Sequence, residues 1–356
     1  MELILEDILR KATEKGASDI YLVSGKPLSM KLGDKIIELH TERLKPDNTL
    51  EFLQEIYMLA SDRNISRVEE YGDDDFSFSL PGVARFRVSA FKQRGTLAAV
   101  IRIVAFDLPD PASLNIPRVA LTQTSRKKGL VLVTGPTGSG KSTTLSCMID
   151  EINKTRNAHI ITIEDPIEFL HKHNHSIVSQ REVSLDTQSF AVALKAALRQ
   201  APDVILIGEL RDSVTIEIAM TAAETGHLVL STVHTIGSAN TIDRIVDAFP
   251  ANQQGQIRVQ LAMVLGAVIS QQLVPSKAGN LIPAFEIMIV NDAIRNMIRE
   301  SKIHQVDGVI TSSAADGMMT MDGSLLKLYR DGQITDMTAI AFSTQPDLMK
   351  KRLASV

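Results

Sequence analysis

A glycine-rich segment at residues 135–143 is the part of the sequence best suited to chemistry. It satisfies the pattern G-x-x-x-x-G-K-[ST] with Gly135, Pro136, Thr137, Gly138, Ser139, Gly140, Lys141, Ser142 and Thr143. The glycines let backbone N–H groups surround a phosphate, Lys141 can reach the β- and γ-phosphate oxygens, and the Ser142 hydroxyl can hold Mg²⁺. We therefore predict a nucleotide phosphate-binding loop here, in preference to a glycine-rich turn with a solvated lysine.

Two acidic segments could complete a site that hydrolyses the nucleotide. Glu209 follows an apolar run. The residue before it is Gly208, where such sites usually carry an aspartate on the metal side. The carboxyl end of a parallel strand lies at the ligand-binding edge of its sheet, so we interpret Glu209 as the base that activates water. Glu164 and Asp165 end another apolar run, and either could supply negative charge beside the metal. The alternative is that all three are solvated acids at strand ends.

Histidines form a second group of candidates. His227 and His234 bracket an apolar run, and a histidine at a strand end can donate a hydrogen bond to a γ-phosphate. Taken alone, each histidine would more often be structural. His171, His173 and His175 alternate in a polar segment with no accompanying acid or cysteine cluster, which indicates a solvated loop more than a metal site.

Arginines are needed to neutralise charge on the phosphoryl group in the transition state. Arg85, Arg87 and Arg102 lie in segments with strand-like alternation, which places Arg85 and Arg87 on one face and Phe86 with Val88 on the other. From spacing alone, these are surface arginines.

The elements around the loop predict a parallel α/β sheet. Apolar runs occur at residues 130–134, 159–163, 203–208 and 227–232, and helical stretches alternate with them. Beyond about residue 250 the pattern is mainly helical, with one further apolar run at residues 284–290. Residues 257–274 are interpreted as a buried helix, because their uninterrupted apolar part is too short to span a membrane.

The N-terminal part differs in pattern. Residues 1–106 combine an amphipathic helix, strand-like alternation and glycine punctuation, which predicts a small α+β domain. The proline-rich residues 107–125 are expected to form a linker. Residues 126–356 then form the nucleotide-binding domain, whose part from about residue 291 is helical.

Composition sets the outer limits. The 356 residues suffice for about two domains, and a net charge of −4 gives no general attraction to nucleic acid. The single cysteine, Cys147, excludes an internal disulfide and a four-cysteine zinc site, and fits a small core residue in a reducing cytoplasm.

An ordered set of motifs resembles the secretion-superfamily ATPases, the motors of type IV pili and type II secretion. The set comprises ASDIYL, RFRVSAF, GPTGSGKST, ITIEDPIEF, LRQAPDVILIGELRD, TAAETGHLVLSTVHT and AIRNMIRE, and it covers essentially the whole chain. The resemblance implies a RecA-like P-loop core with an N-terminal PAS-like domain, a homohexamer, and ATP with Mg²⁺ as cofactors. It also assigns site roles.

By this resemblance, Glu209 is the catalytic base, Glu164 assists the metal with Ser142, and His234 approaches the γ-phosphate. Arg87 and Arg102 match first-domain arginines that close over the nucleotide, which reverses the expectation from spacing. Further nucleotide-binding positions implied by the family are Arg199, Arg211 and His227.

Within the superfamily, the chain is similar to the pilus-retraction (twitching motility) branch. The AIRNMIRE segment (residues 293–300) resembles a motif of that branch, although the segment is also a plain amphipathic helix with Ile294, Met297 and Ile298 inward. The resemblance to this branch implies that the protein acts at the cytoplasmic face of the inner membrane, through a membrane platform protein and beside a second retraction ATPase. Neither membrane insertion nor nucleic-acid binding is expected. The alternatives are an assembly or secretion ATPase, an accessory retraction ATPase, a nucleic-acid-translocating RecA-like motor, or a nucleotide-gated ring with little turnover.

Overall fold

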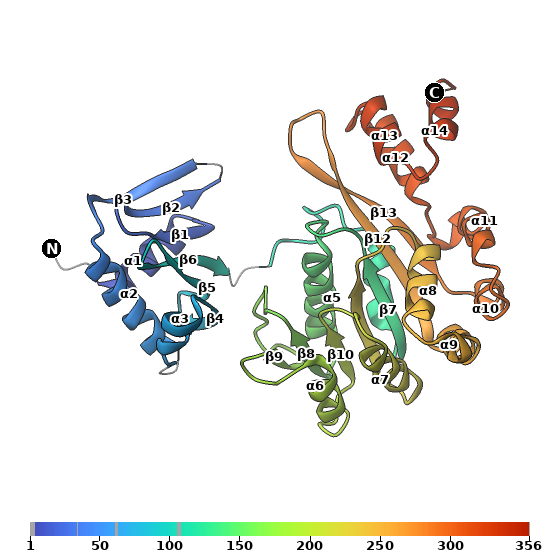
Figure 1. Ribbon diagram of the computed structural model, residues 1–356. Coiled ribbons are helices and arrows are strands. Elements are labelled where there is room, and N and C mark those ends of the chain that lie inside the picture. Colours follow the sequence, from blue (N-terminus) through green and yellow to red (C-terminus); the bar gives the residue numbers. More distant parts are fainter. Residues whose placement is uncertain (1–3, 34, 61–62, 105–107, 356) are drawn as a thin grey trace. The chain divides into compact units, whose positions relative to one another are not determined.

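The computed structural model describes residues 4–33, 35–60, 63–104 and 108–355, and its contacts divide the chain into two compact units. The first is built on residues 4–104, and the second on residues 108–167 and 171–355 (Figure 1). Each has its own apolar core. The predicted fold class is confirmed, because one unit contains a largely parallel α/β sheet and the other is a smaller α+β structure.

An antiparallel sheet in the order β3-β2-β1-β6-β5-β4 forms the first unit. Its strands are β1 (Asp19–Leu22), β2 (Pro27–Leu32), β3 (Lys35–Arg43), β4 (Asp73–Leu80), β5 (Ala84–Gln93) and β6 (Thr96–Val104), and its helices are α1 (Leu5–Glu14), α2 (Pro46–Leu59) and α3 (Ser66–Tyr71). Apolar residues recur at helical spacing on α1, and this stripe is buried in the core of the unit. Phe86 and Val88 on β5 are buried in the same core, as the alternation predicts.

A sheet in the order β13-β12-β7-β11-β10-β8-β9 forms the centre of the second unit. Its strands are β7 (Gly129–Thr134), β8 (His159–Glu164), β9 (Ile177–Glu182), β10 (Val204–Ile207), β11 (Leu228–Val233), β12 (Leu265–Pro275) and β13 (Leu281–Ile289). Neighbouring strands are parallel except β12 and β13, which form a hairpin. The apolar runs predicted as strands form β7, β8, β10, β11 and β13, and they are apolar over most of their length because both faces of the sheet are covered.

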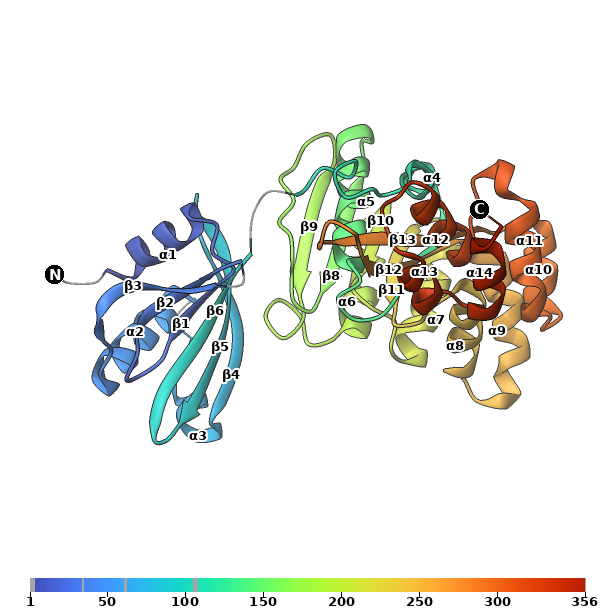
Figure 2. The same ribbon diagram turned by 90° about the horizontal axis from the view of Figure 1, so that it is seen from above.

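Helices pack on both faces of this sheet (Figure 2). One face carries α5 (Lys141–Thr155), whose apolar residues join a core with β7, β12 and β13. The other face carries α6 (Phe190–Ala197), α7 (Ser213–Glu224), α8 (Ser238–Asp247) and α9 (Ala251–Val264). Cys147 on α5 is buried, as expected for a core residue.

The interpretation of residues 257–274 as one buried helix is wrong in its second half. The helix α9 ends at Val264, and β12 begins at Leu265 and pairs with both β7 and β13. A strand buried on both faces has an unbroken apolar run, so periodicity alone does not separate it from a buried helix. Within the described ranges, no helix has the length and apolar character that crossing a membrane would require.

After β13 the described chain is helical. It contains α10 (Asp292–Arg299), α11 (Val306–Ser312), α12 (Met321–Arg330), α13 (Asp336–Phe342) and α14 (Pro346–Leu353). On α10, Ile294 and Ile298 are buried and Met297 packs partly buried against the same core, whereas Arg299 is exposed. The amphipathic reading of this helix is therefore confirmed.

The segment expected as a linker is more ordered than predicted. Residues 108–125 belong by contact to the second unit, and they contain the short helix α4 (Arg118–Thr122). Pro117 immediately precedes α4, where its fixed φ suits the start of a helix. Ile116 and Ala120 are buried beside α5, so this segment is part of the core of the second unit.

Candidate functional site

The glycine-rich loop connects β7 to α5 at the carboxyl end of a central strand, as predicted. Gly138 and Gly140 adopt left-handed conformations, with φ of 77° and 86°, and Gly140 directly precedes the first turn of α5. Lys141 is buried, and its Nζ donates hydrogen bonds to the carbonyl oxygens of Gly135 at 3.0 Å and Pro136 at 2.9 Å. Left-handed glycines beside a helix N-terminus form a concave row of N–H donors that suits a phosphate.

Two buried hydroxyl groups belong to the same loop. The Oγ1 atom of Thr134 and the Oγ atom of Ser139 have no hydrogen-bond partner among the described residues. A buried polar atom without a partner is costly, and such atoms occur at sites that bind a polar ligand. The loop therefore fits an oxygen-rich ligand such as a phosphate chain.

Glu209 and His234 meet at the carboxyl edge of the sheet. Glu209 follows β10 and His234 follows β11, and these strands are parallel neighbours. The Oε2 atom of Glu209 lies 3.3 Å from Nε2 of His234 and 2.6 Å from Nε of Arg211. The side chain of Glu209 is 12% exposed, whereas those of His234 and Arg211 are 45% and 74% exposed. A largely buried carboxylate with two cationic or hydrogen-bonding neighbours can orient a water molecule.

Glu164 ends β8 on the same edge. Its Oε1 atom accepts hydrogen bonds from Oγ1 of Thr162 at 2.6 Å and from Nε2 of Gln180 at 3.1 Å. These bonds hold the carboxylate in one orientation. Gly208 lies between the two acidic strand ends, and a Cβ there would contact the Ile163 carbonyl oxygen at 3.4 Å. The oxygen donors of Glu164 and Ser142 are of the kind that Mg²⁺ prefers.

Two predicted site residues lie at the opposite edge of the sheet. His227 precedes β11, at the amino edge opposite the loop, where its Nδ1 atom is 2.9 Å from the Ala222 carbonyl oxygen. Arg199 follows α6 and lies before β10, also at the amino edge, and it is exposed. The structure does not bring either residue to the phosphate loop.

Arg87 and Arg102 are partners on neighbouring strands of the first unit. They lie opposite each other on β5 and β6, on the face of the sheet away from the core. The next strand places Asp19 opposite Arg102, and the Nε atom of Arg102 lies 2.9 Å from Oδ1 of Asp19. Asp19 belongs to the ASDIYL motif, so two of the sequence motifs meet in one ion pair.

Gln271 on β12 is a site residue that the sequence did not indicate. The strand β12 runs parallel to β7 with Ser270 opposite Thr134, so Gln271 lies beside the start of the loop. A Cβ on Gly135 would overlap the Gln271 carbonyl oxygen, and a Cβ on Gly140 would lie 2.9 Å from its Nε2 atom. The missing side chains at Gly135 and Gly140 therefore make room for Gln271.

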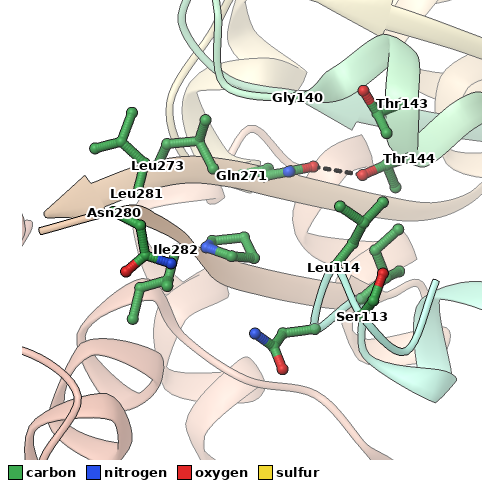
Figure 3. A pocket seen from close by; sticks show the side chains of 13 residues that line it. Ser113, Leu114, Gly140, Thr143, Thr144, Gln271, Leu273, Asn280, Leu281 and Ile282 are labelled. Atoms are coloured by element: carbon green, nitrogen blue, oxygen red, sulfur yellow. Dashed lines mark hydrogen bonds between the residues drawn. The ribbon is translucent and has the colours of Figure 1, made fainter. Parts of the chain in front are cut away.

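A pocket of about 280 Å³ opens beside the loop (Figure 3). Its lining includes Leu114, Ile116, Thr143, Thr144, Gln271 and Ile282. The walls are largely apolar, with polar groups where the pocket meets the first turns of α5. A small apolar pocket next to a phosphate loop has the character of a site for a flat organic ring.

The chain matches a protein family over most of its length. Residues 1–321 match the family described as type II/IV secretion system protein. The Type IV pilus retractation ATPase PilT of Pseudomonas aeruginosa is 44% identical over 331 residues, which cover 93% of this chain and 95% of the relative. A twitching motility protein of Neisseria gonorrhoeae is 52% identical over 266 residues, which cover 74% of this chain and 71% of the relative.

Two solved structures of ATPases are similar to this chain over nearly its whole length. A crystal structure of the pilus retraction motor PilT with bound ADP superposes with a TM-score of 0.90 at 47% identity, covering 98% of this chain and 100% of that one. The Legionella pneumophila ATPase DotB superposes with a TM-score of 0.81 at 26% identity, covering 99% and 95% of the two chains.

Proposed function

This chain belongs to the type II/IV secretion system protein family, and from that premise we propose that it is the ATPase motor of type IV pilus retraction. One observation supports ATP hydrolysis above all. The carboxylate of Glu209 contacts His234 at the sheet edge that also carries the phosphate loop and Glu164. The phosphate loop, the carboxylate proposed to activate water and the histidine proposed to donate a hydrogen bond to the γ-phosphate thus lie on one edge of one sheet.

In the proposed reaction, Glu209 orients a water molecule for in-line attack on the γ-phosphate. The loop N–H groups and Lys141 bind the phosphate oxygens, and His234 donates to the γ-phosphate as charge develops there. Ser142 and Glu164 would hold Mg²⁺, which neutralises phosphate charge when it is bound. The apolar pocket beside the loop receives the base of the nucleotide.

Arg87 and Arg102 are proposed to add positive charge to the bound nucleotide when the domains close. They form an adjacent pair on the exposed face of the first unit, and Asp19 holds the Arg102 side chain in place. Arg211, whose guanidinium contacts the Glu209 carboxylate, contributes further positive charge. For Arg199 and His227, which lie at the amino edge, any role in nucleotide binding would have to act on a neighbouring subunit.

The proposed assembly is a homohexamer that acts at the cytoplasmic face of the inner membrane through a platform protein of the pilus, with a second retraction ATPase as a further partner. Loss of phosphate after hydrolysis reopens the domains and supplies the motion. The exposed face of α10, with Arg299 and Glu300, is available to transmit that motion, because its opposite face is fixed in the core.

The test counts surface pili and measures twitching in cells that lack the gene and in cells that carry Lys141→Ala. Excess pili with lost twitching would establish a retraction motor powered by this site. Bald cells would instead indicate an assembly motor, and would overturn the retraction assignment while leaving the ATPase intact. Twitching that is lost only when a second retraction ATPase is also weakened would indicate an accessory role.

A motor that translocates nucleic acid is the alternative from another class. The net charge of −4 disfavours it, because phosphate backbones are bound through excess Lys and Arg. Stimulation of ATP hydrolysis by added DNA would support that alternative. Tight ATP binding with negligible phosphate release would indicate a nucleotide-gated ring.

A further inference from the structure

Two successive residues of β12, Ser270 and Gln271, contact two different parts of the candidate site. Successive side chains of a strand point to opposite faces of the sheet. Ser270 pairs with Thr134 on β7, the last strand residue before the phosphate loop. The side chains of Ser270 and Gln271 are both buried, so the contacts that each makes are shielded from water.

Gln271 faces the phosphate loop. Its Oε1 atom accepts a hydrogen bond from Oγ1 of Thr144 at 2.7 Å, and Thr144 lies in the first turn of α5 (Figure 3). Its backbone carbonyl closely approaches Gly135, and its amide nitrogen approaches Gly140. One residue therefore contacts the beginning of the loop, the end of the loop and the helix that follows.

Ser270 faces the segment that follows His234. Its Oγ atom accepts a hydrogen bond from the backbone N–H of Gly237 at 2.9 Å. The adjacent N–H of Ser238 donates to Oε1 of Glu286 at 2.6 Å, and Glu286 lies opposite Ser270 on β13. The start of α8, only a few residues after His234, is therefore fixed to the β12–β13 hairpin by two hydrogen bonds, one partly buried and one buried.

We propose that Ser270 and Gln271 are positioning residues that set the phosphate loop and the His234 segment relative to each other. The proposal rests on the ATPase site described above and names two further residues of that site. Gln271 keeps the loop and α5 in the shape that binds phosphate, so it governs nucleotide affinity. Ser270 keeps His234 at its distance from Glu209, so it governs turnover of bound ATP.

The two roles predict different kinetic effects, one on KM and the other on kcat. Gln271→Met keeps the side-chain volume and removes the hydrogen bond to Thr144, so KM for ATP and the dissociation constant for ADP should rise about five- to tenfold, with kcat nearly unchanged. Thr144→Val removes the same bond from the other side, so it should give a similar effect, and the double variant should be no worse than either single one. Ser270→Ala should lower kcat about five- to tenfold and leave KM nearly unchanged.

The matched control is Gln272→Met, the same substitution one residue further along β12. No side-chain hydrogen bond of Gln272 is found in the part of the chain that the structure describes, and its side chain faces away from the loop. It should leave KM and kcat close to those of the unchanged chain. Thermal unfolding of every variant shows whether the fold is retained. If Ser270→Ala is destabilised, Ser270→Thr is the second variant to measure, because it keeps the hydroxyl and should restore part of the lost kcat.

The measurement is steady-state ATP hydrolysis together with ADP binding by calorimetry, on the full chain. A KM effect for Gln271→Met and Thr144→Val and a kcat effect for Ser270→Ala support the proposal. Variants that unfold at lower temperature with unchanged KM and kcat, or a Gln272→Met variant with equal kinetic losses, overturn it. If the unchanged chain neither binds ADP nor hydrolyses ATP, the proposed function itself fails, which is a distinct result.

Discussion

The Nε2 atom of His234 lies 3.3 Å from Oε2 of Glu209, although the two residues follow different strands. The contact is set by register, because β10 and β11 are parallel neighbours with Ile207 opposite Ser231. Glu209 follows Ile207 by two residues, and His234 follows Ser231 by three. We expect groups this close to act on one reacting centre, so the losses of activity caused by their mutation should not simply add.

Glu209→Gln should separate nucleotide binding from hydrolysis. The amide keeps the size of the side chain but accepts a proton poorly, so kcat for ATP should fall at least about a hundredfold. Binding should persist, because the loop and Lys141 are untouched. ADP calorimetry and a phosphate-release assay measure the two quantities side by side, and undiminished hydrolysis would remove Glu209 from its assigned role.

A matched pair of histidine variants tests which edge of the sheet does the chemistry. His234→Asn removes the contact with Glu209 at the carboxyl edge, so kcat should fall about ten- to hundredfold. His227→Asn acts at the amino edge, beside the Ala222 carbonyl, and should change kcat much less. Phosphate release by both variants under saturating ATP gives the comparison. An equal loss for His227→Asn would indicate that this residue reaches a nucleotide on another subunit.

Much of the site could be predicted because its elements are local in the sequence. The pattern from Gly135 to Thr143 specifies a turn and a helix start within nine residues, and the structure has that strand–loop–helix unit. Glu164 and Glu209 could be placed because parallel strands deliver their carboxyl ends to a common edge. The same rule applies to His234, whereas His227, which brackets the same apolar run, precedes the strand and so lies at the opposite edge of the sheet.

The contributions of β12 could not be predicted for a physical reason. Its residues are buried on both faces, so the run from Leu265 onward has no alternation and cannot be told from a buried helix by periodicity. Gln271 approaches Gly135 only through strand pairing between distant segments. The spacing of residues along the sequence does not indicate which distant strands pair. The proline-rich stretch before Ser125 illustrates the same limit, since burial of Ile116 and Ala120 against α5 orders a segment with loop-like composition.

Cys147 should be a slow thiol in the folded chain. Burial raises the pKa of Cys147 to about 11, with smaller contributions from Asp150 and Asp110, and the side chain is 1% exposed. The thiolate is the reactive form, so at pH 8 the folded thiol should react with a disulfide reagent at least about a hundredfold more slowly than the unfolded one. The rate should climb with pH towards 11, as the thiolate fraction grows. Rapid reaction of the folded chain at pH 8 would show that α5 opens readily.

The last prediction concerns the stability of the first unit. The Asp74 side chain is fully buried, and its carboxylate accepts hydrogen bonds from Arg63 at 2.9 and 3.0 Å and from the Tyr57 hydroxyl at 3.0 Å. Asp74→Asn removes the negative charge and leaves part of this network unsatisfied. Because Arg63 retains some exposure to water, the expected loss is about 2–3 kcal/mol in the free energy of unfolding, below the range for a fully buried pair.

Urea unfolding followed by tyrosine fluorescence measures this loss. The chain has no tryptophan, and three of its four tyrosines, Tyr21, Tyr57 and Tyr71, lie in the first unit, so the signal reports mainly on that unit. The control is Asp75→Asn, because Asp75 is the next residue on β4 and is exposed. Its effect should stay within about 0.5 kcal/mol. Equal losses for the two variants would show that net charge on β4, and not the buried network around Asp74, stabilises this unit.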